Sequence, residues 1–556
     1  MAGTRLQIVS AFVLFTLLAA PVAWYLTKVE RMDLPMSRIH QLSWQKSRFG
    51  GPDKFQVDIY RLSSSLAALP SFLPSRALNI VYVMHEMELT ADDKEMMQQS
   101  VKLGQQATDD ALKTLVRTMP KHFSVFLLCG DKESNAGPLL TVGKYRHAWS
   151  WKCQVTAGDA MHSAIEKLIQ SHVYPPQFEK SVKQDMKTKI ARRSLHYRLK
   201  FSLLKENPVT LWKEDLQTLV DQYLGRFVQK IGAVANFTVE TQVVQYARLA
   251  KEITPSVDGK EFYINAEDLK HFKSVNDFLD ASVLDDGEQV LHFMAALPDV
   301  IHAPLYIRSA GRNQGRNDLA TSFELPGWGI AVIVNPHALN ERAVLDDKAA
   351  SASGRRAREL QRVMGLFVSE FRTLLGIPSF SHRQKEELMA SVDSSRHELL
   401  FLPSPADGIA DWELDVVMRE RFTKLMQSAI ETLQSTVKLV EALPQLSVLG
   451  RVQARVESAV TKLEAILFDK CQEEQQNCVD MSDLGHLLAM ARQASELTDA
   501  AYYDHTMIRQ LYFPQEQMLG VYAPLLAPLL LPFVLGFIRE VKRYKAKRIA
   551  QKVKVP

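Results

Sequence analysis

The feature that most constrains this chain is a pair of apolar stretches, one near each end. Residues 6–26 are interrupted only by Gln7, Ser10 and Thr16, and residues 518–538 contain no charged side chain. As a helix, each stretch is about 30 Å long, which matches the hydrocarbon core of a bilayer. We therefore expect two transmembrane helices with a large domain between them.

A cleaved signal peptide is the alternative for the first stretch. Cleavage requires small residues at positions −3 and −1. A cut after Ala20 makes Pro21 the first residue after the cleaved bond, and a cut after Ala23 places Pro21 at position −3. Both positions are unfavourable for cleavage. Trp24 and Tyr25 end the stretch, where an aromatic belt is expected. These positions favour an uncleaved anchor.

The charges of the chain are unevenly placed. Residues 539–556 hold eight Lys or Arg and one acid, so this tail carries +7 and the rest −3 of the net +4. The positive-inside rule then places residues 539–556 in the cytosol and, with two spans, also residues 1–5. The bulk of the chain is expected in the lumen of the secretory pathway. An acidic body excludes nucleic acid as a partner, whereas the tail suits membrane lipids.

The second apolar stretch carries a proline at every fourth position, namely Pro524, Pro528 and Pro532. Each proline removes the hydrogen bond to the carbonyl four residues earlier, and this spacing places the freed carbonyls on nearly one helix face. An unpaired carbonyl in lipid is costly. This face is expected to pack against partner helices, and a merely kinked anchor is the alternative.

The region between the two stretches has two compositions. Residues 27–350 are expected to form a luminal α/β region, because short buried strands alternate with amphipathic stretches such as 92–119. Residues 351–515 are expected to be mainly helical, with apolar stripes at steps of three and four and a turn at 443–446. The predicted buried strands are residues 77–84, 123–129 and 329–336.

No motif for catalysis, nucleotide binding or metal binding is found. The serine-hydrolase elbow, the P-loop and the dinucleotide fingerprint are all missing. The pairs His85-Glu86 and His397-Glu398 lack the second histidine that a zincin needs. We predict no catalytic residue, metal site or cofactor. The four cysteines form no C-x-x-C pair, and their disulfide pairing is left open: Cys129, Cys153, Cys471 and Cys478.

One modification site agrees with a luminal location. The triplet Asn236-Phe237-Thr238 is an N-glycosylation sequon, and Asn236 is the predicted acceptor. The loop 308–329 is long and partly basic. A charged surface loop is the favoured interpretation of that segment, with contact to an anionic head group as the alternative.

Several strings, taken together and in this order, resemble the PIG-S family, whose members are subunits of the GPI transamidase complex. No such string occurs in residues 92–150. The strings are "DLPMSRI" (33–39), "FSLLKENP" (201–208), "ANFTVETQ" (235–242), "LPDVIHAPLYI" (297–307), "LPGWGIAVIVNP" (325–336), "WELD" (412–415) and "LYFPQEQMLGVYAPLLAPLLLP" (511–532).

The resemblance implies a non-catalytic subunit in the endoplasmic reticulum membrane. The complex removes the C-terminal signal of a proprotein and joins the new carboxyl end to a GPI lipid, with catalysis assigned to PIG-K. The implied partners are PIG-K, PIG-T, PIG-U and the GPI-anchor attachment subunit, and direct contact with the proprotein is left open. The alternatives are an independent membrane-anchored luminal hydrolase and an adaptor that uses the basic tail.

Overall fold

The computed structural model divides the chain into two compact units. The helical unit comprises residues 1–49, 424–469 and 490–556, and the α/β unit comprises residues 50–423 and 470–489. Apart from the single residues Leu14, Leu269, Ser404 and Leu446, the structure describes residues 32–46, 55–62, 80–87, 89–115, 123–128, 139–151, 158–173, 194–208, 215–249, 253–256, 259–265, 288–308, 319–335, 349–377, 399–402, 407–443, 448–468, 484–507 and 515–552.

The first sheet of the α/β unit has six strands in the order β15-β4-β5-β3-β1-β2. All neighbours are parallel except β4 and β5. The predicted strands 77–84 and 123–129 are confirmed as β2 and β3. The bounds are β1 Phe55–Leu62, β2 Ile80–Glu86, β3 Phe123–Leu128, β4 Leu140–Val142, β5 His147–Ser150 and β15 Leu399–Phe401.

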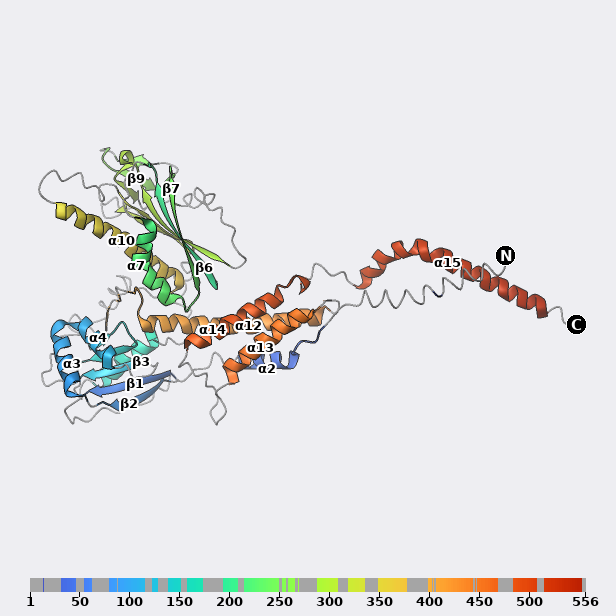
Figure 1. Ribbon diagram of the computed structural model, residues 1–556, viewed down its shortest axis with the longest axis horizontal. Helices are drawn as coiled ribbons and strands as arrows, with labels where there is room; N and C mark the ends of the chain where they lie inside the picture. Colours follow the sequence, from blue (N-terminus) through green and yellow to red (C-terminus); the bar gives the residue numbers. More distant parts are fainter. Residues whose placement is uncertain are drawn as a thin grey trace. The chain divides into compact units, whose positions relative to one another are not determined.

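Helices supply apolar residues to both faces of this sheet, as a parallel sheet requires. Helix α5, Gly158–Leu168, continues as a π-helix over Ile169–Val173 and packs on the face that carries Val57 and Ile59. Helices α3 and α4 pack on the opposite face, which carries Tyr60 (Figure 1).

The single helix predicted over 92–119 is wrong in one respect, because the structure has two helices. Helix α3, Ala91–Leu103, begins at a capping box between Thr90 and Asp93. It ends at Gly104, whose φ of 112° is readily adopted only by glycine. Helix α4, Gln105–Leu115, starts directly afterwards.

The second sheet has five strands in the order β13-β14-β10-β6-β7. The four strands from β14 to β7 are parallel, and β13 is antiparallel to β14. The predicted strand 329–336 is confirmed as β14. The bounds are β6 His196–Lys205, β7 Asn236–Gln245, β10 Gln289–Leu297, β13 Ser322–Leu325 and β14 Gly329–Ile333.

One face of the second sheet packs against α7, Leu216–Ile231, and α10, Ala349–Leu375 (Figure 1). Phenylalanines fill that layer, and the rings of Phe293 and Phe371 lie 5.7 Å apart. The other face packs against a four-stranded sheet in the order β12-β11-β9-β8. Its bounds are β8 Thr254–Pro255, β9 Phe262–Asn265, β11 Leu305–Arg308 and β12 Leu319–Ala320.

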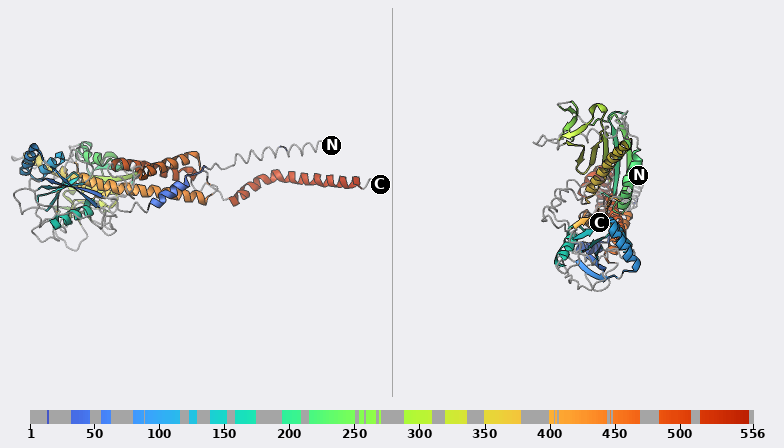
Figure 2. Two further views of the ribbon diagram at one scale, coloured as in Figure 1. Left: turned by 90° about the horizontal axis from the view of Figure 1, so that it is seen from below. Right: turned by 90° about the vertical axis from the view of Figure 1, so that its left-hand side faces the viewer.

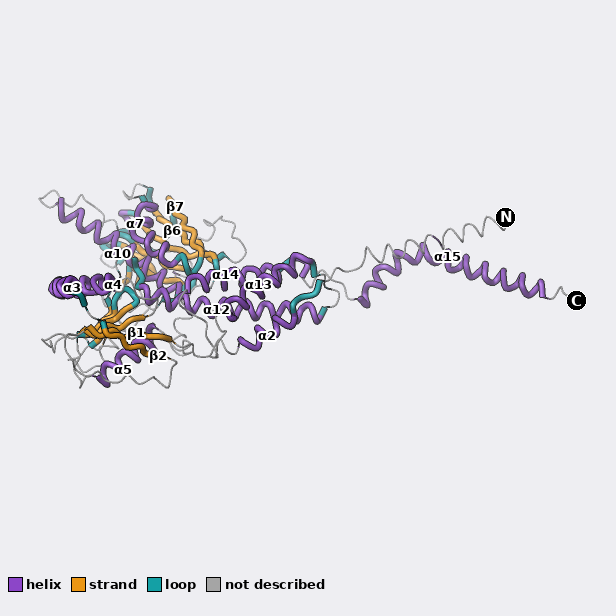
Figure 3. Tube along the Cα trace, turned by 60° about the horizontal axis from the view of Figure 1, so that its bottom comes forward, coloured by secondary structure: helices purple, strands orange, loops and turns teal. Residues whose placement is uncertain are grey.

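The helical unit takes its helices from both ends of the chain (Figure 3). Helices α12 and α14 begin in the α/β unit and end in the helical unit. The predicted helical stripes are confirmed as α12, α13 and α14, although the short strand β15 also lies in that part of the chain. The bounds are α2 Met36–Lys46, α12 Asp411–Ala442, α13 Gly450–Phe468, α14 Leu484–Tyr502 and α15 Gln515–Lys552.

Arginine–carboxylate pairs join the segments of the helical unit. Arg38 on α2 donates to both carboxylate oxygens of Glu464 on α13, at 2.9 and 2.5 Å. Asp504, after α14, accepts from Arg451 and Arg455 on α13. Bidentate pairs of this kind fix orientation as well as distance.

Helix α15 contains all three prolines of the second apolar stretch, and it is bent (Figure 2). The side chains of Pro524, Pro528 and Pro532 are exposed. Among the residues that the structure describes, no helix is both long enough and apolar enough to cross a membrane. The first predicted span, 6–26, lies outside the described residues except for Leu14.

Candidate functional site

Three parallel strands of the second sheet end at the same level. Lys205, the last residue of β6, pairs in register with Gln245 of β7 and with Leu297 of β10. Ligands and partners of open α/β sheets bind at such carboxyl ends. We call the segments that follow these strands, residues 206–208, 246–247 and 298–304, the carboxyl edge.

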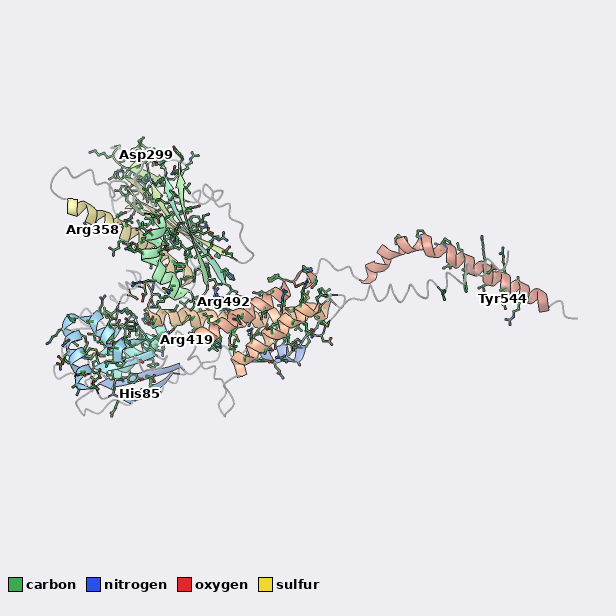
Figure 4. The ribbon with its side chains drawn as sticks, viewed as in Figure 1. His85, Asp299, Arg358, Arg419, Arg492 and Tyr544 are labelled. Carbon is green, nitrogen blue, oxygen red and sulfur yellow. The ribbon has the colours of Figure 1, made fainter. Side chains whose placement is uncertain are left out.

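A network of hydrogen bonds organises the carboxyl edge. Glu206 accepts the backbone N–H of Asp299 at 2.7 Å through Oε2, and its Oε1 lies 2.8 Å from His302 Nδ1. Asn207 Nδ2 donates to Asp299 Oδ2 at 3.2 Å. Asp299 Oδ1 accepts the N–H of Val300 at 2.6 Å, which begins a 3-10 helix over Val300–His302. Figure 4 labels Asp299 at this end of the sheet.

The segment that leaves this network is also held in place. Asn335, just after β14, accepts from Leu305 N at 2.8 Å and donates to Leu305 O at 3.1 Å. Phe262 N donates to Pro304 O at 2.9 Å, and the Ala303–Pro304 peptide bond is cis. The connection from β10 to β11 is therefore fastened to both β14 and β9.

Three large side chains of the carboxyl edge are exposed. Val300 is 60% exposed, Ile301 is 72% exposed and Tyr246 is 78% exposed. We call these three residues the exposed triplet. Tyr246 directly follows β7 and has a φ of 58°, a left-handed conformation that costs a non-glycine residue of order 1 kcal/mol or more. Large exposed side chains on rigid backbone suit recognition of another molecule.

Sequence reasoning identified none of these residues as a site, although a signal was present. The string "FSLLKENP" contains Glu206, and the string "LPDVIHAPLYI" contains Asp299 and His302. Both strings carry the family resemblance. Each string begins on or at the end of a buried parallel strand. The rule that such strands end at a common edge could therefore have brought these side chains together.

The predicted glycosylation site is accessible. Asn236 is the first residue of β7, the last strand in the order of its sheet. Asn236 and Thr238 are both exposed, and Asn236 Nδ2 lies 3.3 Å from His196 Nδ1. The acceptor amide is open to modification, and glycosylation remains a prediction.

Two of the other residues singled out in the sequence, His85 and Arg308, are described, and each contacts a tyrosine ring. His85 Nε2 lies 3.3 Å from Asp58 Oδ1, and its ring stacks on Tyr60 at 4.8 Å. Arg308 lies 4.0 Å above the ring of Tyr263. The remaining candidates lie outside the described residues: Cys129, Cys153, Cys471, Cys478, Arg312, Arg316, His397 and Glu398.

A serine and a histidine on neighbouring strands of the first sheet lie near an aspartate on α4. Ser124 on β3 pairs in register with His147 on β5, and His147 Nε2 lies 2.8 Å from Asp109 Oδ1 on α4. All three are at most 2% exposed, so no substrate reaches them. This arrangement is structural. Within the described parts of the chain, no cluster of three or more potential metal ligands is present.

Comparison with known proteins identifies the family. The model of the family "PIG-S: Phosphatidylinositol-glycan biosynthesis class S protein" matches residues 10–547. The chain is 27% identical over 342 residues to the "GPI-anchor transamidase component PIGS" of Bos taurus and 26% identical over 342 residues to that of Homo sapiens, in each case over 60% of this chain and 55% of the relative.

A more distant relative gives the same assignment. The "GPI transamidase component PIG-S homolog" of Schizosaccharomyces pombe is 24% identical over 356 residues, which is 63% of this chain and 54% of that protein. The chain thus spans about half the length of the curated relatives that it matches. Because the family model covers residues 10–547, the chain belongs to the PIG-S family.

Proposed function

We propose that this protein is a non-catalytic subunit of the GPI transamidase complex, which supports attachment of GPI anchors to proprotein C-termini in the endoplasmic reticulum. The observation that carries this proposal is the family match over residues 10–547, nearly the whole chain. The relatives are named as components of the transamidase, and a component acts within an assembly.

The proposed topology has two membrane spans, residues 6–26 and 518–538. It is supported by the uncharged character of the second stretch and by the +7 charge of the tail that follows. Residues 1–5 and 539–556 are then cytosolic. The luminal part is divided into an α/β region, 27–350, and a helical region, 351–515.

Catalysis is assigned to a separate, cysteine-protease-like subunit. The sequence holds no nucleophile motif, and the Ser124–His147–Asp109 cluster is sealed from solvent. The proposed partners are PIG-K, PIG-T, PIG-U and the GPI-anchor attachment subunit, with lipids around both spans. The work of this chain is then to bind and to position, not to transform a substrate.

Affinity purification of the tagged full-length chain in mild detergent tests this function. We expect a cysteine-protease-like subunit and further companions to be retained at constant ratios. Cells that lack the chain should lose GPI-anchored reporters from their surface, and the full-length chain should restore them. A chain that purifies alone, while its deletion leaves the reporter unchanged, would contradict the proposal.

A further inference from the structure

We propose that the carboxyl edge is a docking surface, on which Val300 and Ile301 insert into an apolar pocket of another protein of the same assembly. The identity of that partner as a companion subunit rests on the proposed function. The surface itself is defined by the described residues at the ends of β6, β7 and β10.

Hydrogen bonds fix the backbone of the segment that carries Val300 and Ile301. Val300 N donates to Asp299 Oδ1, and Ala303 N donates to Val300 O at 3.4 Å. Asp299 is fastened to Glu206 and Asn207, two residues that follow the neighbouring strand. An immobilised side chain loses little conformational entropy when it binds. The network thus fixes the backbone that carries two exposed aliphatic side chains, so binding has less backbone freedom to remove.

Tyr246 also lies at this edge of the sheet. It follows β7 as Glu206 follows β6, and two strand spacings, about 10 Å, separate β7 from β10. Tyr246 has a left-handed φ, and its aromatic side chain is 78% exposed at the same edge. Tyrosine is enriched among residues that dominate binding energy. The exposed triplet thus combines two aliphatic side chains with a nearby aromatic side chain.

The size of the exposed triplet indicates which occupant the surface suits. The three exposed side chains offer roughly 400 Å² in total, about half of the ~800 Å² that each partner contributes to a stable interface. A symmetric pairing of two copies through this patch alone is therefore too small. An exposed triplet of this size instead fits a pocket of a partner protein that also contacts other surfaces of this chain.

The charges beside the pair argue against a lipid surface. Glu206, Asp299 and His302 lie beside Val300 and Ile301, and these residues do not form the cluster of Lys and Arg that anionic head groups attract. Interfaces between proteins commonly have an apolar centre with a polar rim. The fitting partner has an apolar pocket bordered by hydrogen-bond donors.

The test uses the full-length chain in cells. The double variant Val300→Asp with Ile301→Asp places charges in the pocket, and Leu103→Asp is the matched control because Leu103 is 79% exposed on α3. We expect the double variant to retain at least one companion about tenfold less well than wild type, which a lost hot spot produces. Leu103→Asp should retain all companions.

A photoreactive phenylalanine analogue at position 301 provides a second measurement that introduces no charge. It should crosslink to a protein that also copurifies with the wild-type chain, whereas the analogue at position 103 should not.

Crosslinking only to a second copy, or only to lipid, would overturn the docking proposal. A wild-type chain that retains companions, with a double variant that retains the same set equally well, would overturn the docking proposal and leave the proposed function standing. A wild-type chain that purifies alone would overturn both.

Discussion

At the scale of single residues, Gly143 shows how tightly the first sheet is packed against α4. A Cβ atom at this position would lie 2.0 Å from Asp109 Oδ1 and 3.2 Å from His147 Nε2. Asp109 is fully buried, and it accepts a hydrogen bond from Lys144 N at 3.1 Å. The carboxylate therefore has little room to move away from a larger residue.

Replacing Gly143 by alanine should destabilise the α/β unit. Overpacking of a core position costs about 1–3 kcal/mol, and we expect the upper half of that range because the displaced group is a buried carboxylate. Urea unfolding followed by tryptophan fluorescence measures the change. Gly225→Ala is the matched control, because nothing lies within 4 Å of that Cβ position and alanine favours the helix α7. Equal midpoints for the two variants would contradict the packing argument.

His172 makes the stability depend on pH. Burial lowers the pKa of His172 from 6.5 to about 4, and its ring packs 5.0 Å from that of Phe401. The folded state then keeps the imidazole neutral at a pH where the unfolded chain binds a proton. The contribution of the neutral His172 to the free energy of unfolding is complete above pH 6.5 and is lost progressively as the pH falls toward 4.

Between pH 7.5 and pH 5.5 this linkage should remove about 1.4 kcal/mol of stability, which corresponds to one pKa unit. The measurement is the urea midpoint of the full-length chain at the two pH values. His172→Phe should reduce the difference between them by that amount. An unchanged difference in the variant would show that other groups cause the pH dependence.

At the scale of elements, the proline spacing of α15 carries the clearest consequence. Pro524, Pro528 and Pro532 share nearly one helix face and are exposed in the structure. Each leaves a carbonyl of the preceding turn without its helical donor. Such a face is stabilised by protein neighbours in a membrane, because lipid offers no donor.

Replacing the three prolines by leucine should therefore weaken subunit association and leave membrane insertion intact. Quantitative pull-down of companions measures association, and resistance to alkaline extraction measures insertion. We expect a several-fold loss in the first and no change in the second. Unchanged pull-down yields would leave α15 as a kinked anchor, and loss of insertion would show that the prolines act on the span itself.

The elements that the sequence predicted well are those with local signals. Buried runs such as 123–129 and the stripes of α12 and α13 depend on neighbours in the chain. Strand β15, with three residues, has no such signal and forms only because it pairs with β4, more than 250 positions earlier. Pairing between distant segments is set by tertiary packing, which periodicity does not encode.

The candidate site shows the same limit. Glu206 and His302 are 96 positions apart, and each alone has the appearance of an ordinary loop residue. Their contact follows from the shared register of β6 and β10, which the sequence does not specify. Asn236 could be singled out from the sequence because a sequon is a contiguous pattern, and its glycosylation remains a prediction.

At the scale of the whole molecule, the asymmetry of charge determines how the chain is expected to lie across the membrane. The tail from Arg539 onward holds +7 while the remainder holds −3. Arg539, Lys542 and Lys545 are exposed on α15, where anionic head groups can reach them. In the proposed two-span topology, the sequon at Asn236 lies on the opposite side of the bilayer from the tail, so glycosylation would report the orientation of the entire chain.

Asn236 should carry a glycan in cells, because its amide is exposed at the start of β7 and the proposed topology places it in the lumen. Endoglycosidase treatment of the full-length chain should increase its gel mobility by the equivalent of a single glycan. Thr238→Ser keeps the sequon and should keep the shift, whereas Asn236→Gln and Thr238→Val should abolish it. A second sequon appended after Pro556 should stay unmodified, since the proposed topology places the basic tail in the cytosol. If the appended site were modified while Asn236 was not, the orientation would be reversed, and the luminal assembly proposed for this chain would fail with it.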